Sequence, residues 1–413
     1  MTWTWLGELV FPSLVANGTF GPGCRYLSFK PAGRPPWTST VVYGKVLVAG
    51  VPDEHSVVLK VKHRCRKMRH VLKCDMQFHN EIAAYEKILP FLVGAGVAED
   101  YGCLFAKYYY GRNACGKTAE QDVIVLKDMR TEGYELFKDS LFLDYDHVVA
   151  ALRALGKFHG MSYVAKSKNP LRFRELSRHV LDTQWDAEGR WIFGDAELRT
   201  LAMRGVRPLM ERPGYDDGRM DACLELLASA ERNLRRVMRS DGRWSVLCHG
   251  GFCRDNLMFR YDVVTGRPTH VLPFDLAGIR CGSPALDLSF FLYMNTDNRL
   301  RENRWEDLLD VYHEAVSQVG AAEGVAVPVR DDLDAEMKTH ALYGLAHVSY
   351  LLALTARVPD DHDMVSECKR EFDMATDQEK VNLSMDAGGQ ASTDLLMDVV
   401  KHIVDKGYTK KPL

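Results

Sequence analysis

The chain has 413 residues, of which 46% are hydrophobic and 26% are charged, and its formal net charge is -3. A chain of this length is too long for one ordinary compact core, so we expect two lobes or domains. The nearly neutral charge argues against a protein that mainly binds nucleic acid, because such proteins normally carry a strong basic excess.

Cysteine usage and the N-terminal residues indicate the compartment. The ten cysteines include no CxxC pair and no Cys/His cluster with zinc-finger spacing, a pattern that fits a reducing environment. The first residues, MTWTWLGELVF, lack a basic region and contain Glu8, so we expect no signal peptide. No run of about 18 uncharged apolar residues occurs, so we expect no membrane span. These observations favour a soluble, cytoplasmic protein.

The N-terminal third is rich in strand patterns. Residues 1–40 begin with a short helical pattern and end in a loop rich in Gly and Pro. Two β-patterned runs follow, TVVYGKVLVAG and SVVLKVK, separated by a turn at residues 52–54. A helix is predicted over 75–89, and CLFAKYYY and DVIVLKDM are further strand candidates. We assign these elements to a small α+β lobe, residues 1–130.

The remaining residues, 131–413, are mostly helical. The helical patterns cover 146–162, 219–239, 284–294, 303–319, 333–356 and 393–405. One strand-rich island, residues 246–278, interrupts them, and its two apolar runs flank a hairpin turn at Thr265 and Gly266. The fold class is therefore α+β, with a small β-rich N-lobe and a larger helical C-lobe that carries an embedded hairpin.

This hairpin places two oxygen-bearing side chains at suitable spacing for a metal. Asn256 ends the turn HGGFCRDN, and Asp275 ends the returning strand in VLPFDLAG. Converging on one edge, an amide oxygen and a carboxylate would complete a magnesium site with ATP phosphates and water. The alternative is that Asp275 only caps a turn before Gly278, and the spacing alone does not decide between these two interpretations.

A lysine strand supplies the cation that phosphates need. In SVVLKVK, alternation puts Val58, Lys60 and Lys62 on one strand face. If Lys60 reaches the phosphates, Val58 on the same face forms an apolar roof for adenine, as in the V-A-I-K strand of kinases. Choosing Lys62 would put a lysine against the base, so the register favours Lys60.

The next helix offers Lys60 a partner. Glu81 lies three residues after Phe78 and four before Tyr85, so it shares the apolar face of the helix. An inward carboxylate is costly unless it is paired, and an ion pair with Lys60 would remove that cost. The alternative is a glutamate at the edge of the face that reaches water.

Four segments carry a family resemblance: FHNEIAAYEKILP, VIVLKDM, LCHGGFCRDNLMFRYD and FDLAGIRCGSPALDLSFFLY. They resemble the ecdysteroid kinase-like (CHK kinase-like) family, which is related to choline kinases and aminoglycoside phosphotransferases. The resemblance runs in register from about residue 40 to 320. It implies a two-lobed protein-kinase-like fold that binds ATP and Mg²⁺. By resemblance, Lys60 binds phosphates, Glu81 holds Lys60, Asn256 and Asp275 bind metal, Leu126, Lys127 and Asp128 form the adenine hinge, Asp287 braces the HG-loop backbone, and His249 shapes that loop.

The sequence departs from the family pattern at the catalytic base. The family loop has an Asp after HG that orients the substrate hydroxyl, and this chain has Gly251 there. A general base typically contributes about 10²–10⁴ in rate, so its loss should slow turnover while leaving nucleotide binding largely intact. Asp255, just before the metal-binding Asn, is a candidate substitute base. A second departure is the segment RPPWTSTVVYG, which has no GxGxxG and leaves the phosphate lid undefined.

Several other features receive structural interpretations. The basic run KVKHRCRKMRH, residues 60–70, is interpreted as a solvated connection rather than a nucleic-acid site. His159 is expected to be a hydrogen-bonded core histidine. His340 and His347 share a helix face but have no neighbouring acidic ligand, so we expect no metal there. Trp185 and Trp191 either line a substrate cleft or pack a loop.

Two functions remain in competition. The first is an ATP-dependent phosphotransferase for a hydroxyl of a small molecule, with ecdysteroid-like or amino-alcohol acceptors implied by resemblance. The second is a pseudokinase that binds nucleotide or ligand without useful turnover, which Gly251 favours. Retention of Lys60, Glu81, Asn256 and Asp275 favours the first. We expect a small hydroxylated partner, no nucleic acid and no membrane.

Overall fold

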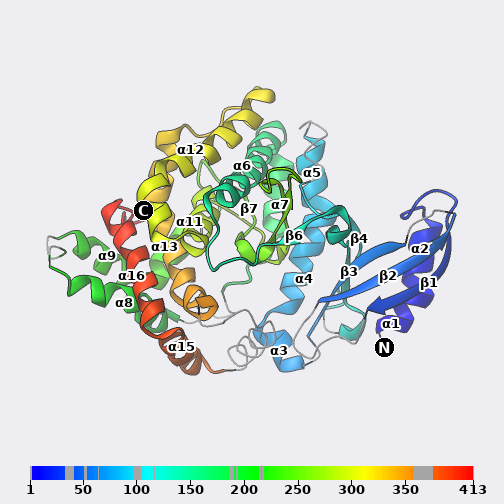
Figure 1. The fold of residues 1–413 in the computed structure, drawn as a ribbon, viewed down its shortest axis with the longest axis horizontal. Helices are drawn as coiled ribbons and strands as arrows, with labels where there is room; N and C mark the ends of the chain where they lie inside the picture. Colours follow the sequence, from blue (N-terminus) through cyan, green and yellow to red (C-terminus); the bar gives the residue numbers. More distant parts are fainter. Residues whose placement is uncertain are drawn as a thin grey trace.

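The computed structural model describes all residues except 1, 33–40, 51–53, 64, 96–103, 116, 186–189, 192–193, 214, 216–217, 357–374 and 413. Figure 1 shows a sheet near the N-terminus at one end of the molecule and a larger mass of helices at the other. No helix in the described part of the chain is both long and apolar enough to cross a membrane.

The N-terminal sheet has five antiparallel strands in the order β1-β2-β3-β5-β4. Their bounds are β1 Arg25–Ala32, β2 Val41–Ala49, β3 His55–Val61, β4 Tyr108–Arg112 and β5 Val123–Lys127. The strands predicted for the segments now seen as β2, β3 and β5 are confirmed, while β4 begins later than the segment CLFAKYYY suggested. The predicted turn at residues 52–54 lies partly outside the described residues.

The two faces of β3 have different surroundings. Val57 and Leu59 are fully buried against the N-terminal helices α1 (Thr2–Trp5) and α2 (Phe11–Ala16), which cover the outer face of the sheet. The alternation predicted from the sequence is therefore confirmed. It leaves Lys60 on the inner face, toward the rest of the molecule.

Strand β1 was missed because its segment contains a proline and follows Gly-rich residues. Arg25–Ala32 pairs with β2 at the edge of the sheet, with an irregularity in register between Tyr26 and Ser28. Proline cannot donate to a ladder hydrogen bond, but an edge strand needs only one paired side and tolerates it. The prediction that residues 1–40 end only in a loop is therefore wrong for this strand.

The helix predicted over 75–89 is longer than expected. It begins as α4 (Cys74–Ala83), passes through a π-helical turn at Ala84–Ile88, and ends as α5 (Leu89–Gly94). Its apolar face packs into the core that continues into the helical lobe. Insertions of this kind locally widen a helix and often occur at functional sites.

The helical lobe contains more helices than the sequence patterns predicted. Its described helices are α6 Tyr145–Lys168, α7 Pro170–His179, α8 Gly194–Met210, α9 Arg219–Leu227, α10 Ala230–Val237, α11 Pro284–Asn295, α12 Asn298–Ala322, α13 Arg330–Ala356, α15 Asp377–Asp386 and α16 Gly389–Asp405. The pattern over 219–239 forms two helices rather than one, because the chain leaves helical geometry at Ser229 (φ -134°, ψ 51°). β5, the last strand of the N-terminal sheet along the chain, ends at Lys127, just before the lobe boundary that we proposed at residue 130.

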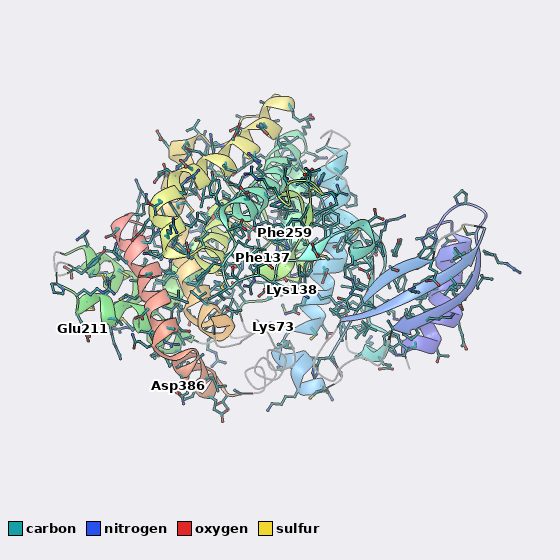
Figure 2. All side chains as sticks on the ribbon, in the orientation of Figure 1. Lys73, Phe137, Lys138, Glu211, Phe259 and Asp386 are labelled. Atoms are coloured by element: carbon teal, nitrogen blue, oxygen red, sulfur yellow. The ribbon has the colours of Figure 1, made fainter. Side chains whose placement is uncertain are left out.

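The embedded hairpin is present and is anchored on α6. Its strands are β8 (Leu257–Tyr261) and β9 (Pro268–Pro273), and the short strand β6 (Glu135–Leu136) pairs with β8. Phe137 and Phe259, both labelled in Figure 2, contact the His147 ring of α6 at centroid distances of 4.7 and 4.9 Å. These buried contacts fix the hairpin to the helical lobe.

Within the basic run 60–70, Lys62 does not behave as a solvated residue. Its side chain is fully buried, and its ammonium group binds the Asp75 carboxylate, Asn113 Oδ1 at 2.7 Å and Asp122 Oδ2 at 2.9 Å. Asp122 is itself fully buried. The interpretation of this run as a solvated connection is therefore wrong for Lys62. Its burial could not be read from the run itself, because the acidic partners Asp75 and Asp122 lie outside it.

We predict that Lys62→Met destabilises the protein by about 3–5 kcal/mol, because it leaves the Asp122 carboxylate buried without a counter-charge. The matched control is Lys45→Met, since Lys45 pairs with Glu54 at 2.5 Å but both side chains are about half exposed, at 56% and 48%. Denaturant unfolding of both variants measures the difference. Equal midpoints for the two variants would contradict this account of Lys62.

Candidate active site

The candidate site is centred on Lys60, at the inner face of β3. Its Nζ lies 2.5 Å from Glu81 Oε2 on α4 and 2.6 Å from Asp275 Oδ1, which follows β9. The expected ion pair with Glu81 is therefore present, and the contact with Asp275 adds a second one that the sequence did not indicate. One ammonium group thus links the sheet, its helix and the hairpin.

The surroundings of this lysine keep it charged. Burial alone would lower the pKa of Lys60, but the two carboxylates outweigh that effect and hold its pKa above the usual range. Glu81 is only 1% exposed, between Phe78 and Tyr85 on the apolar face of the helix. Burial raises the pKa of Glu81, and the Lys60 ammonium in direct contact with its carboxylate opposes that effect. The alternative in which Glu81 reaches water does not hold.

Asp275 adopts an unusual backbone conformation. Its φ of 65° and ψ of 68° lie in the left-handed region, just after β9 ends at Pro273 and before a single helical turn at Leu276–Gly278. For a residue other than glycine this conformation is unfavourable, although Asp tolerates it better than most. It turns the carboxylate toward Lys60, and such strain is typical of functional positions.

Asn256 lies next to the Asp275 segment at the base of the hairpin. Its backbone oxygen accepts a hydrogen bond from the Phe274 N–H at 3.0 Å. Its side-chain Nδ2 donates to the Gly251 carbonyl at 2.9 Å, so Oδ1 is the atom left for another partner. A carboxylate from Asp275 and an amide oxygen from Asn256 are donors that Mg²⁺ accepts, so the residues present fit this metal.

The backbone of the loop between β7 (Val246–Cys248) and Asn256 is held by the side chain of Asp287 of α11. The Asp287 carboxylate accepts hydrogen bonds from the backbone N–H groups of His249 (2.6 Å) and Gly250 (2.9 Å). His159 contacts the same carboxylate at 3.2 Å and Tyr312 Oη at 2.7 Å. The brace expected of Asp287 is present, and His159 is the buried, hydrogen-bonded histidine that the sequence predicted.

His249 is fully buried within this loop. Its Nδ1 accepts a hydrogen bond from the Gly251 N–H at 3.3 Å, which closes a tight turn. Burial lowers the pKa of His249, and the attraction of Asp287 and Asp275 only partly opposes that effect. A neutral imidazole that accepts a backbone hydrogen bond shapes the loop rather than transferring a proton.

The two adjacent glycines of the loop differ in what they require. Gly250 has a φ of 78°, and a Cβ there would lie 1.8 Å from the Gly278 carbonyl oxygen. Gly251 lies outside the left-handed region, and the nearest atom to a Cβ would be Asn256 Nδ2 at 3.4 Å. Only the first position therefore needs glycine for steric reasons.

Asp255 is already engaged by its neighbour. Its Oδ1 accepts hydrogen bonds from Arg254 Nε at 3.0 Å, and the pair is held because Arg254 Nη1 donates to the carbonyls of Ser140 (2.8 Å) and Leu141 (2.6 Å). The Asp255 side chain is 55% exposed. The contact with Arg254 therefore restricts where this carboxylate can point.

The predicted adenine hinge lies at the end of β5. Leu126 is buried and pairs with Val58 across the strands, which brings the apolar roof and the hinge together. The N–H groups of Lys127 and Asp128 donate to the carbonyls of Lys107 (2.8 Å) and Ser56 (3.0 Å). These two amides are already used within the sheet, so neither is left to donate a hydrogen bond to a base.

Sequence reasoning missed a buried asparagine that joins the site to the helical lobe. Asn80, fully buried beside Glu81, donates to the carbonyls of Leu181 (2.8 Å) and Ala277 (3.2 Å) and accepts from the Leu181 N–H at 2.8 Å. It therefore ties α4 to the turn that follows Asp275. The available signal was the position of Asn80 in the sequence, because this polar residue is adjacent to Glu81 and to the apolar face of the predicted helix.

The other histidines and the two tryptophans singled out from the sequence make no contact with the Lys60 site that the structure records. His340 Nδ1 contacts the Glu336 carbonyl at 2.9 Å and lies 3.4 Å from the Glu336 carboxylate, so the expectation of no acidic neighbour is wrong for His340. His347 is buried, and its Nδ1 contacts the Tyr343 carbonyl at 2.7 Å. Trp191 is 2% exposed and packs in the core. Trp185 pairs with it through an isolated bridge, and the Arg235 guanidinium lies 4.3 Å from its ring centroid. The start of the lid segment, residues 34–40, lies outside the described residues.

A small antiparallel sheet with one internal helix, followed by a helical lobe that carries a hairpin, is the two-lobed protein-kinase-like fold. The model of the ecdysteroid kinase-like family matches residues 40–321, which is more than half of the chain. The chain belongs to the ecdysteroid kinase-like family.

Solved structures with similarity to this chain include several phosphotransferases. A spectinomycin phosphotransferase in complex with ADP and spectinomycin has 9% identity and a TM-score of 0.40, over 95% of this chain and 98% of that chain. An ethanolamine kinase from Plasmodium vivax has 11% identity and a TM-score of 0.37, over 86% and 83%. An aminoglycoside 2'-phosphotransferase in complex with GDP has 17% identity and a TM-score of 0.35, over 92% and 98%. A search of curated proteins found no match.

We predict that Gly250→Ala and Gly251→Ala differ sharply in stability. The first places a Cβ against the Gly278 carbonyl in a left-handed conformation and should cost about 3 kcal/mol or more. The second meets only ordinary contacts and should change stability by less than about 1 kcal/mol. Thermal or denaturant unfolding measures both. A destabilised Gly251→Ala variant would show that this position, too, is sterically restricted.

Proposed function

We propose that this protein is an ATP- and Mg²⁺-dependent phosphotransferase that acts on a hydroxyl of a small molecule. The observation that carries the proposal is the convergence of Glu81 and Asp275 on Lys60, at 2.5 and 2.6 Å, from three separate elements. Membership of the ecdysteroid kinase-like family supports the same reaction class. Ecdysteroid-like compounds and amino alcohols are the acceptors that the family resemblance suggests.

Each residue of the site has a proposed task. Lys60 binds the ATP phosphates, and Glu81 keeps its ammonium group aimed at them, because a buried carboxylate restricts where the lysine can point. Val58 and Leu126 face the adenine, whose hydrogen bond we expect from the backbone after Asp128. Asp287 and His249 hold the loop on which the acceptor would rest.

Asn256 and Asp275 are the proposed metal ligands. A bound Mg²⁺ would neutralise the charge on the phosphates. The Asp275 carboxylate also contacts Lys60 directly. Lys60 would contact a phosphate oxygen of the nucleotide while Glu81 holds its ammonium group.

A second function remains a candidate on one specific observation. Gly251 occupies the position of the acceptor-orienting Asp, and the neighbouring Asp255 is bound to Arg254. The loop therefore lacks a carboxylate at the first position, and at the second the carboxylate is restricted by its ion pair with Arg254. This favours slow transfer or, as the alternative, a pseudokinase that binds nucleotide without useful turnover.

The first test of the proposal is nucleotide binding. ATP with Mg²⁺ should raise the melting temperature in a concentration-dependent way, because a ligand that binds only the folded state stabilises it by mass action. Asp275→Asn should remove most of the Mg²⁺ dependence, and Asn is chosen because it tolerates the left-handed conformation at this position. Thermal unfolding with ATP, with Mg²⁺ and with both measures the effect.

The control for this test is Asp241→Asn, which changes an exposed carboxylate paired with Arg239 far from any proposed ligand. It should respond to ATP and Mg²⁺ like the unmodified protein. Melting curves that are insensitive to millimolar ATP and Mg²⁺ would exclude both the enzyme and the nucleotide-binding pseudokinase.

The second test addresses the missing carboxylate. Gly251→Asp should raise the transfer rate by about 10²-fold on an acceptor that the unmodified protein turns over slowly, because it restores a group that orients the hydroxyl. The backbone there accepts a side chain, so the variant should fold. ATP affinity should change little. Phosphotransfer across a panel of hydroxylated sterols and amino alcohols measures the rate.

The matched variant is Asp255→Asn. If Asp255 supplies the base, this change abolishes turnover and Gly251→Asp does little. A measurable native activity that neither change affects would contradict the assignment of this loop. Absence of activity in every variant, with ATP binding retained, would favour the pseudokinase.

A further inference from the structure

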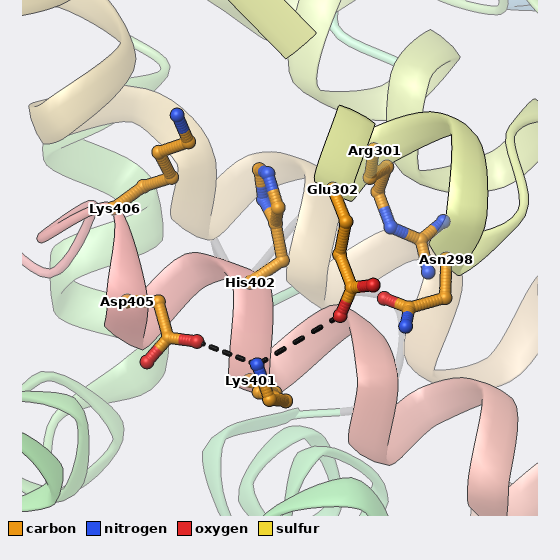
Figure 3. Close-up of a pocket in the computed structure, with 7 residues that line it drawn as sticks. All are labelled: Asn298, Arg301, Glu302, Lys401, His402, Asp405 and Lys406. Carbon is orange, nitrogen blue, oxygen red and sulfur yellow. Dashed lines mark hydrogen bonds and ion pairs between the residues drawn. The ribbon is translucent and has the colours of Figure 1, made fainter. Parts of the chain in front are cut away.

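A cavity lined by polar side chains lies in the helical lobe, where α12 and α16 meet. Figure 1 shows both helices in the helical lobe, away from the sheet. Its volume is about 240 Å³. Figure 3 shows Asn298 and Arg301 entering it from α12, and Lys401 and His402 entering it from α16. None of these residues belongs to the candidate active site.

Arg301 lacks a counter-charge in this cavity. Its side chain is 1% exposed, Nη1 donates to the Thr296 carbonyl, and buried Nε has no hydrogen-bond partner. It forms no ion pair with any described residue, and the carboxylates of Asp398 and Glu302 attract it only at longer range. A buried guanidinium without a direct counter-ion is unfavourable, so the site is one that an anion would stabilise.

His402 presents a second donor without an acceptor. The ring is packed against Trp305 at a centroid distance of 4.2 Å, and burial lowers the pKa of His402 to about 3, so it is neutral. Nδ1 lies 3.1 Å from Tyr293 Oη, and buried Nε2 has no partner. The tautomer in which Tyr293 donates to Nδ1 leaves the ring proton on Nε2, as a donor.

The acidic groups of the cavity are already paired. Lys401 Nζ lies 2.8 Å from Asp405 and 3.9 Å from Glu302, as the dashed lines in Figure 3 mark. Lys406, the third cation, pairs with Glu306 outside the cavity at 2.6 Å. Asn298 is the first residue of α12, and the Asp297 carboxylate before it caps the helix by accepting a hydrogen bond from the Leu300 N–H at 2.7 Å. Both carboxylates that line the cavity contact Lys401, and neither forms an ion pair with Arg301.

We propose that this cavity binds a small oxyanion, either inorganic phosphate or the phosphate group of a small metabolite, through Arg301, His402 Nε2 and the Asn298 amide. The anion supplies the counter-charge that Arg301 lacks and the acceptor that His402 lacks. This site is independent of nucleotide binding at Lys60 and of any phosphotransfer.

The decisive variant is Asn298→Asp, which is nearly isosteric and places a carboxylate inside the cavity, beside Arg301 in Figure 3. In calorimetry and thermal unfolding, inorganic phosphate should bind the unmodified protein saturably and raise its melting temperature relative to chloride of equal ionic strength. Asn298→Asp should abolish that binding, because the new carboxylate takes the place of the anion. It should also raise the melting temperature in chloride.

The matched control is Asn303→Asp on the exposed face of the same helix, where Asn303 Nδ2 donates to the Arg299 carbonyl at 2.7 Å. It should leave phosphate binding unchanged. Arg301→Met should weaken phosphate binding at least about 10-fold, and Asn298→Asp carries the test should that variant not fold. Glycerol phosphate in parallel separates the sources, since tighter binding than inorganic phosphate identifies a metabolite. Absence of saturable binding, or binding that survives Asn298→Asp, would overturn the proposal.

Discussion

The contact of one ammonium group with two carboxylates organises the site. Lys60 is separated by 21 residues from Glu81 and by 215 from Asp275, yet its Nζ contacts both. Glu81 is itself buried and depends on the Lys60 ammonium as its counter-charge, whereas Asp275 is partly exposed and adds a second contact from the hairpin side. The position of α4 relative to the sheet, and of the hairpin relative to both, therefore depends on this triad. Asn80 strengthens the same junction by tying α4 to the turn after Asp275.

The loop that would receive the acceptor depends on a different carboxylate. Asp287 accepts two backbone hydrogen bonds from the loop and a third contact from His159, all within the core of the helical lobe. Burial raises the pKa of Asp287, but these contacts outweigh it and the pKa is lowered overall. The backbone of the loop is thus held by residues of the helical lobe, whereas the neighbouring Asp275 contacts Lys60 of the sheet.

The sequence predicted those features that depend on local periodicity. The alternation in β3 placed Lys60 on the inner face, and the helical spacing of Phe78, Glu81 and Tyr85 identified the partner of the lysine. Contacts between distant segments were not accessible in the same way: nothing local distinguishes Lys62 from an exposed lysine until Asp122 is brought beside it. Strand β1 was missed because a proline inside a strand is acceptable only at a sheet edge, and edge position is a property of the assembled sheet.

The two glycines of the loop differ in whether the backbone requires a glycine. Gly250 is required because its conformation is left-handed and the Gly278 carbonyl occupies the space of a side chain. Gly251 is under neither constraint, so the backbone does not explain why a carboxylate is missing there. The loop keeps its hydrogen bonds to Asp287 and its Asn256 contact without that carboxylate. The residues proposed to bind nucleotide and metal are therefore physically separable from the group that would activate the acceptor, and we expect a change at residue 251 to alter turnover without altering binding.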